Sequence, residues 1–232
     1  MKSKFIFLVF LIFTANLAAQ DEVRLFSNVI KKNIRKLNNE TSNAYANGDI
    51  EKGKYIFDTL INNQIIGSRF EDYAFRKVNG GKLNLSSFKK PILLQTYTSW
   101  CVINNGEIQA LNKLAKKHRK DIQIIVVFWD KKRDAKKFIN QFSWAIEVCY
   151  ATESSYKDEE VVNSLKYGMG FLASYCLDEK LNLVSLKIVP PKQPKAKTPL
   201  KEKIKWNYEI YENNITDLLL KSNSDKKMLT KN

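Results

Sequence analysis

One cysteine of this chain stands where a thiol can become reactive. Cys101 follows the apolar segment 91–99 (PILLQTYTS), which is typical of a strand, and precedes a segment whose apolar residues recur at the spacing of one helix face. We therefore expect Cys101 at the N-terminus of a helix, where unpaired backbone N–H groups and the helix dipole favour the thiolate. A thiol in that setting titrates at roughly 3.5 to 7.5, whereas a free cysteine titrates near 8.5, so Cys101 is the candidate nucleophile.

The neighbours of Cys101 decide what chemistry its thiol can perform. Trp100 precedes it, Glu107 follows in the expected helix, and Asn104 stands where a two-cysteine redox site of the usual spacing has its second thiol. Asn104 cannot attack a mixed disulfide, so a two-electron cycle cannot close within this motif. Glu107 either exchanges a proton with Cys101 or is an acid that favours a helix start, and the second interpretation is preferred. Cys101 itself is either a reactive thiol or a relic packed against its two apolar neighbours.

Hydrophobic periodicity predicts the elements that position these residues. The segments 92–99 and 122–129 (IQIIVVFW) are almost continuously apolar, as expected for parallel strands buried on both faces. In the inferred sheet, a strand at 145–150 forms one edge and is followed by 122–129, 92–99 and 173–177. The other predicted elements are a β-hairpin of 70–78 and 82–85, a helix at 131–142 capped by Asp130, helices at 158–166 and 200–220, and a strand at 181–189 paired with 173–177.

The first 19 residues have the layout of a secretory signal. Lys2 and Lys4 precede an apolar run, and small residues follow it before Gln20. The run is too short to span a bilayer comfortably. We therefore expect export to the periplasm or the extracellular space, with residues 1–19 removed and no transmembrane segment in the mature chain.

The rest of the chain divides into three parts. Residues 20–66 carry two amphipathic patterns separated by Asn47-Gly48-Asp49, which predict an N-terminal helical hairpin. Residues 67–221 are expected to form one α/β domain, in which 190–199 is a basic, proline-rich loop. Residues 222–232 are expected to be a disordered tail.

Charge and cysteine count narrow the classes of partner. The formal net charge of +15 raises the question of nucleic acid, but the predicted export and the lack of a nucleic-acid motif argue against it. We prefer the interpretation that the lysines form a solvated surface with a weak attraction for acidic partners or anionic lipid surfaces.

Cys101, Cys149 and Cys176 are too widely spaced for a metal site, so we expect no metal and no cofactor. Cys149 and Cys176 should be core residues without a disulfide, since two strands separate them.

Several short motifs, taken in their order along the chain, resemble one protein family. The motifs are Gly67 with Phe70–Tyr73, Gly80–Leu85, Lys90–Pro91, Ser99–Cys101, Glu107, Leu111–Leu114 and Val126–Asp130. Over residues 67–220 the chain is similar to the TlpA/ResA branch of the thioredoxin superfamily, also called redoxins or AhpC/TSA-like proteins. The resemblance implies an α/β, thioredoxin-like three-layer fold with a mixed central sheet, here preceded by the helical hairpin. It also implies the activity of thiol–disulfide oxidoreductases.

The resemblance assigns roles to the residues of the motif around Cys101. Cys101 matches the attacking cysteine, and Trp100 matches the aromatic residue before it. Glu107 matches an acid that helps to set the protonation of the thiols, while Asn104 replaces the resolving cysteine.

The resemblance also implies a substrate groove at Phe171, Leu172 and Ala173. The family places a cis-proline there, opposite the active cysteine, but this chain has no proline between Pro91 and Pro190. Leu172 is its best replacement. Because a cis bond before a non-proline residue costs about 2.5 to 4 kcal/mol, we expect a trans peptide and a reshaped groove.

Two classes of function stay open on these residues. The first is an exported thiol–disulfide oxidoreductase relative that uses Cys101 alone, with a small thiol or a partner protein bearing a thiol or disulfide to resolve the mixed disulfide. The second is a redox-inactive module that keeps the fold as a binding surface, which the lost cysteine and proline favour. Peroxidase activity is a minor option, because Thr98 lies three residues before Cys101 as in peroxiredoxins but Leu94 stands where their proline is expected.

Overall fold

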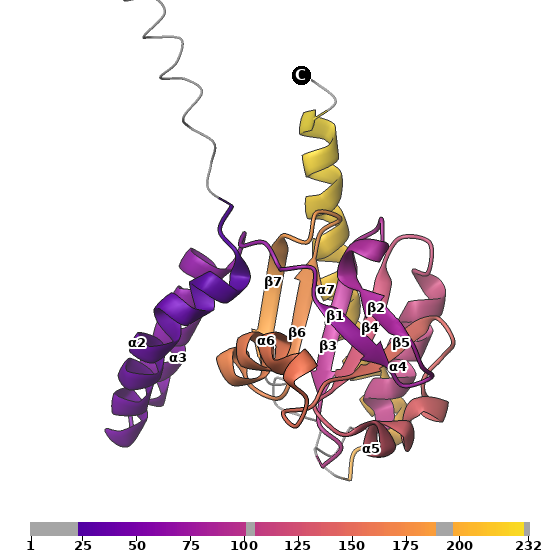
Figure 1. Ribbon diagram of the computed structural model, residues 1–232, viewed down its shortest axis with the longest axis horizontal. Helices are drawn as coiled ribbons and strands as arrows, with labels where there is room; N and C mark the ends of the chain where they lie inside the picture. The colour runs from indigo at the N-terminus through magenta and orange to yellow at the C-terminus, as the bar shows by residue number, and fades with distance from the viewer. Residues whose placement is uncertain (1–22, 101–104, 189–196, 230–232) are drawn as a thin grey trace, which may run out of the picture.

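The computed structural model describes residues 23–100, 105–188 and 197–229. In these residues the chain forms a mixed sheet of seven strands with helices on both faces, and an N-terminal helical hairpin stands beside the sheet (Figure 1). The strands are β1 (Ala74–Lys77), β2 (Lys82–Asn84), β3 (Ile92–Tyr97), β4 (Gln123–Phe128), β5 (Ile146–Tyr150), β6 (Ala173–Leu177) and β7 (Leu183–Ile188). The predicted α/β fold with a mixed central sheet and a preceding helical hairpin is confirmed.

The sheet has the order β2-β1-β5-β4-β3-β6-β7. Its centre is parallel, with β3 beside β4 and β4 beside β5, whereas the outer pairs are antiparallel. All of β3 is buried, and so is β4 except its first residue, which explains their continuous apolar sequences. β3 and β4 therefore end side by side at one edge of the sheet.

The predicted position of the 145–150 strand at a sheet edge is wrong. The β1–β2 hairpin continues the sheet beyond β5, with Arg76 opposite Tyr150 and Lys77 opposite Cys149. Side-chain contacts hold this extra pair, because the Arg76 guanidinium lies 4.5 Å from the centre of the Tyr150 ring and donates to the buried carboxylate of Asp158. Such long-range contacts leave no periodic signal in the sequence.

Two apolar clusters cover the two faces of the sheet. One contains α2, the turn after α3 and the segment after α6, and the other contains α4 and α7. The helices are α2 (Phe26–Ala46), α3 (Ile50–Leu60), α4 (Asn105–Lys117), α5 (Lys132–Lys136), α6 (Glu159–Val161) and α7 (Leu200–Leu229), with π-helical turns at Ile61–Ile65 and Val162–Tyr167. The predicted helix at 131–142 is shorter than expected, and Asp130 does not cap it, because the cap position of α5 is Lys131.

A carboxylate links the N-terminal hairpin to the α/β domain. Asp49 caps α3 by accepting the N–H of Lys52 at 3.0 Å, whereas α2 has no capping side chain of its own at Leu25. Glu71 supplies one from the start of the α/β domain, since its Oε1 accepts the N–H of Ser27 at 3.1 Å and also the Ser27 hydroxyl. This contact fixes the start of α2 against the domain.

The last helix, α7, extends beyond its predicted end at residue 220. Residues 222–229, expected as part of a disordered tail, continue α7 as far as Leu229. Ser222 is buried, and its hydroxyl donates to the carboxylate of Glu179 at 2.8 Å, so the helix is still packed where its sequence turns polar. Most of the expected proline-rich loop, like the expected signal segment 1–19, lies outside the described residues. No helix among the described residues is long and apolar enough to span a membrane.

Candidate functional site

The adjacent ends of β3 and β4 are joined by Asp130. Both carboxylate oxygens of Asp130 are used, one accepting the backbone N–H of Ser99 and the other its hydroxyl, each at 2.6 Å. Ser99 immediately precedes Trp100, so Asp130 holds the chain in place at the point where it leaves the sheet toward the motif. Sequence patterns assigned Asp130 to a helix cap and missed this role.

The predicted groove segment lies beside Trp100. The rings of Trp100 and Phe171 are 5.5 Å apart at an angle of 72°, an edge-to-face contact between residues far apart in sequence. Two side chains form hydrogen bonds with the backbone of Phe171. Trp129 Nε1 donates to its carbonyl oxygen at 3.1 Å, and Thr96 Oγ1 donates to the same oxygen at 3.2 Å. Thr96 Oγ1 also accepts the N–H of Ala173 at 2.9 Å. Residues at the start of β6 and before α4 are therefore brought together.

The three predicted groove residues face different surroundings. Phe171 is 43% exposed, Leu172 is half-buried against the α4–α7 cluster, and Ala173 is buried. The peptide bonds through this segment are trans, as predicted from the missing proline. Only Phe171 offers a large exposed side chain next to Trp100, which is itself 68% exposed.

Glu107 is a buried acid. It lies in the first turn of α4, is only 8% exposed, and accepts hydrogen bonds on Oε1 from the hydroxyls of Tyr97, at 2.6 Å, and Tyr211. Tyr97 ends β3 and Tyr211 lies on α7, so the sheet and the last helix both contribute to this cluster. Burial is the main cause that raises the pKa of the Glu107 carboxyl, while the two hydroxyls act in the opposite direction.

Both tyrosines of this cluster serve as hydrogen-bond donors. Burial and the negative charge of Glu107 raise the pKa of Tyr97 and that of Tyr211 well above their usual range, so both hydroxyls keep their protons. Tyr211 also lies 3.4 Å from Oε1 of Gln95, which accepts the hydroxyl of Ser174. Polar Gln95 inside an apolar strand is a sequence signal of a buried polar network.

The three cysteines and Asn104 are the remaining predicted site and core positions. Cys101 and Asn104 lie outside the described residues. Cys149 and Cys176 are buried and free, and the strands β4 and β3 stand between them, as predicted. Burial raises the pKa of each of these two thiols to about 12, so neither competes as a nucleophile. The described residues hold no group of three or more metal-ligating side chains.

Two comparisons of the sequence with known proteins found similar proteins. Residues 66–171 match the family model of the AhpC/TSA family. This match covers less than half of the chain. A thioredoxin-like protein, YneN of Bacillus subtilis, is 24% identical over 115 residues, which cover 49% of this chain and 66% of YneN, just under two thirds of its length.

Comparison with solved structures concerns the fold alone. The solution structure of a candidate protein disulfide isomerase from Bacteroides thetaiotaomicron has a TM-score of 0.51 and 17% identity, and the match covers 66% of this chain and 89% of that one. A thiol:disulfide interchange protein from a Bacteroides species has 21% identity and a TM-score of 0.45, covering 53% and 80% of the two chains. The first shows that the fold is thioredoxin-like, whereas the second is too distant to carry an argument.

Proposed function

We propose that this chain is an exported thiol–disulfide oxidoreductase of the AhpC/TSA family that works with a single cysteine, Cys101. The observation that carries the proposal is the buried carboxyl of Glu107 in the first turn of α4, held by two tyrosine hydroxyls. Burying an ionisable group costs free energy unless it is hydrogen-bonded, and perturbed acids of this kind cluster at reactive sites. Glu107 follows Cys101 by six residues, which supports a role in setting the protonation of the thiol.

The proposed reaction is one thiol–disulfide exchange followed by a second from outside. The Cys101 thiolate attacks one sulfur of a disulfide in a partner protein, so the partner's S–S bond breaks, a Cys101–partner S–S bond forms, and the other partner sulfur leaves as a thiolate. Because Asn104 offers no second thiol, an external thiolate attacks the mixed disulfide at the Cys101 sulfur. That step releases the reduced partner and leaves Cys101 in a disulfide with the external thiol. A second external thiolate then attacks the external sulfur of this disulfide, so its bond to Cys101 breaks, the two external thiols become joined in a disulfide, and Cys101 leaves as the thiolate.

The second candidate is a redox-inactive binding module. The exposed ring pair of Trp100 and Phe171 favours it, since such a pair can contact a partner without any bond being made. The absence of a second cysteine at position 104 also favours it.

The pH dependence of alkylation separates the two candidates. Iodoacetamide labelling of the native protein, followed by mass spectrometry from pH 5 to 10, should give a Cys101 midpoint well below the ordinary value of about 8.5. Cys101→Ser is the control that should take no label, since Cys149 and Cys176 are buried. A midpoint at or above about 8.5, or an inert Cys101, would contradict redox function and leave the binding module.

Export and domain organisation are part of the same proposal. Residues 1–19 act as a signal, 20–66 form the helical segment, and 67–221 form the catalytic domain. Mass spectrometry of the protein from fractionated cells should find a mature chain that begins at Gln20 outside the cytoplasm. A cytoplasmic chain that retains Met1 would contradict export.

A further inference from the structure

A loop at the amino end of β5 carries an exposed tryptophan. Trp144 lies two residues before β5 and is 76% exposed. Asn112 of α4 fixes this loop, because its Oδ1 accepts the N–H of Ser143 at 2.6 Å and its side-chain amide donates to the carbonyl oxygen of Gln141 at 2.8 Å. A single exposed ring is common on protein surfaces, so what surrounds Trp144 decides whether it binds a partner.

Cations from two further segments lie beside the ring of Trp144. The guanidinium carbon of Arg119, just after α4, is 5.9 Å from the centre of that ring. Lys116 follows Asn112 by four residues and precedes Arg119 by three, and residues at these spacings are neighbours on one face of a helix. The amine of Lys90, from the bend before β3, donates to the carbonyl oxygen of Arg119 at 2.6 Å. We call Trp144, Arg119, Lys116 and Lys90 the basic patch.

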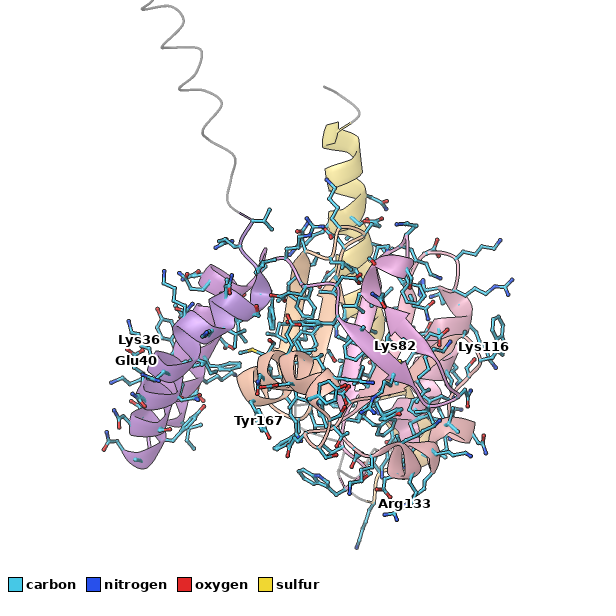
Figure 2. All side chains as sticks on the ribbon, viewed as in Figure 1. Lys36, Glu40, Lys82, Lys116, Arg133 and Tyr167 are labelled. Carbon is cyan, nitrogen blue, oxygen red and sulfur yellow. The ribbon has the colours of Figure 1, made fainter. Side chains whose placement is uncertain are left out.

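The basic patch keeps a net positive charge. Lys116 and Arg119 are exposed, and neither forms an ion pair with a carboxylate of the described part of the chain. Asp121 is the acid that interacts with Lys90, and it offsets only one of the three charges. Figure 2 shows Lys116 on the side of the α/β domain away from the N-terminal hairpin, so the hairpin leaves this side of the domain uncovered.

The basic patch and the candidate site lie at opposite ends of the parallel strands. Lys90 and Arg119 precede β3 and β4, whereas Ser99 and Trp100 follow β3. β3, β4 and β5 run parallel, so the residues before them share one edge of the sheet and the residues after them share the other. A partner bound at the basic patch therefore leaves Trp100 accessible.

We propose that the basic patch binds the surface of a membrane that contains anionic phospholipids. The phosphate groups of such lipids attract lysine and arginine side chains, and each cation near the surface adds to the attraction. Tryptophan combines an apolar ring with a polar N–H, which makes it stable at the level of the lipid headgroups. The choice of a membrane over a nucleic acid rests on the proposed export, whereas the binding itself needs neither export nor a reactive thiol.

The test measures sedimentation of the full mature chain, beginning at Gln20, together with vesicles. Vesicles of phosphatidylglycerol and phosphatidylcholine in equal parts should bind the protein, and high salt should weaken the binding. Vesicles of phosphatidylcholine alone should bind it at least about tenfold more weakly. Trp144→Ala should weaken binding about five- to tenfold, because no ring then enters the headgroup layer.

Removal of charge locates the membrane-binding surface. The double variant Lys116→Gln with Arg119→Gln should raise the dissociation constant about 25-fold, about fivefold for each cation lost. The matched control, Lys131→Gln with Lys132→Gln, removes the same charge from exposed positions after β4, at the opposite edge of the sheet, and should have little effect. All four side chains are exposed, so both variants should fold, which circular dichroism checks.

Several outcomes would overturn the proposal. They are equal binding to the two kinds of vesicle, no binding up to about 1 mM anionic lipid, or an equal loss in the two double variants. Binding of poly-glutamate or of a DNA duplex, without vesicle binding, would assign the basic patch to an acidic protein or a nucleic acid instead. Vesicle binding together with an inert Cys101 would support the basic patch and reject the redox function, so the two proposals fail separately.

Discussion

Removing the Tyr211 hydroxyl tests the buried acid cluster most directly. Tyr211→Phe deletes one of the two hydroxyls that donate to Glu107 and leaves the ring in its apolar surroundings. A hydrogen bond to a charged group contributes about 1.5 to 3 kcal/mol, whereas one between neutral groups contributes about 0.5 to 1.5 kcal/mol. We therefore expect a loss of stability of about 1.5 to 3 kcal/mol where Glu107 is ionised. For a chain of this size that corresponds to about 3 to 12 °C in melting temperature.

The loss should depend on pH with a definite sign. Burial raises the pKa of the Glu107 carboxyl in the folded protein above its value in the unfolded protein. The contribution of this carboxyl to the free energy of unfolding is therefore complete at a pH below the unfolded pKa, and it is lost as the pH rises through the folded pKa. The Tyr211 hydrogen bond lowers that folded pKa, so its removal raises the pKa further and increases the cost of ionisation. Tyr211→Phe should thus destabilise the protein more at pH 7 than at pH 4, where the acid is largely protonated in both states.

Urea unfolding followed by far-UV circular dichroism at both pH values measures this difference. Tyr208→Phe is the matched control, since Tyr208 lies one turn away on α7 and its hydroxyl is 3.3 Å from the exposed amine of Lys117. The double variant with Glu107→Gln gives the coupling energy. The reasoning is refuted if Tyr211→Phe costs the same at both pH values, or if the two substitutions add within about 0.5 kcal/mol.

Three further predictions concern the frame of the site. Gly106→Ala should destabilise by about 1 to 3 kcal/mol in urea unfolding, because a Cβ there would lie 2.8 Å from the backbone of α7, and unchanged stability would contradict this close approach. Iodoacetamide at pH 8 should label neither Cys149 nor Cys176 in the native protein and both after denaturation, as mass spectrometry can show. Asp130→Ala should lower the unfolding free energy by about 1.5 to 3 kcal/mol by leaving the N–H and hydroxyl of Ser99 without their acceptor, and a loss below about 0.5 kcal/mol would argue against that bond.

The sequence predicted those parts of the fold that follow from local patterns. Continuous apolar runs identified β3 and β4 as central parallel strands, and the turn signal around Asn79-Gly80-Gly81 identified the β1–β2 hairpin. The neighbour of that hairpin could not be predicted, because its pairing with β5 is fixed by the contacts of Arg76 with Tyr150 and Asp158. These residues are too far apart in sequence for any periodicity to relate them.

The sequence predicted which residues form the candidate site, but it did not predict the buried hydrogen bonds within that site. The motif placed Glu107 in the first turn of a helix and the resemblance placed Phe171 in the groove, but neither indicated that the acid is buried under two tyrosine hydroxyls. Tyr97 and Tyr211 each occupy an apolar position of their own element, so they look like ordinary core residues until the fold brings their hydroxyls to one carboxylate. Buried polar clusters of this kind arise from tertiary packing alone.

The missing second cysteine changes what a reactive Cys101 would do. In a two-cysteine site the second thiol sits within the same motif and releases a trapped partner by intramolecular attack, whereas here release must wait for a thiol from solution. The lifetime of the mixed disulfide then depends on how long the partner shields that bond. A partner that also contacts the exposed rings of Trp100 and Phe171 would lengthen this lifetime, because it stays bound while the external thiol must compete for access. Partner binding at the exposed rings and the lack of a second cysteine therefore both favour a long-lived mixed disulfide over rapid turnover.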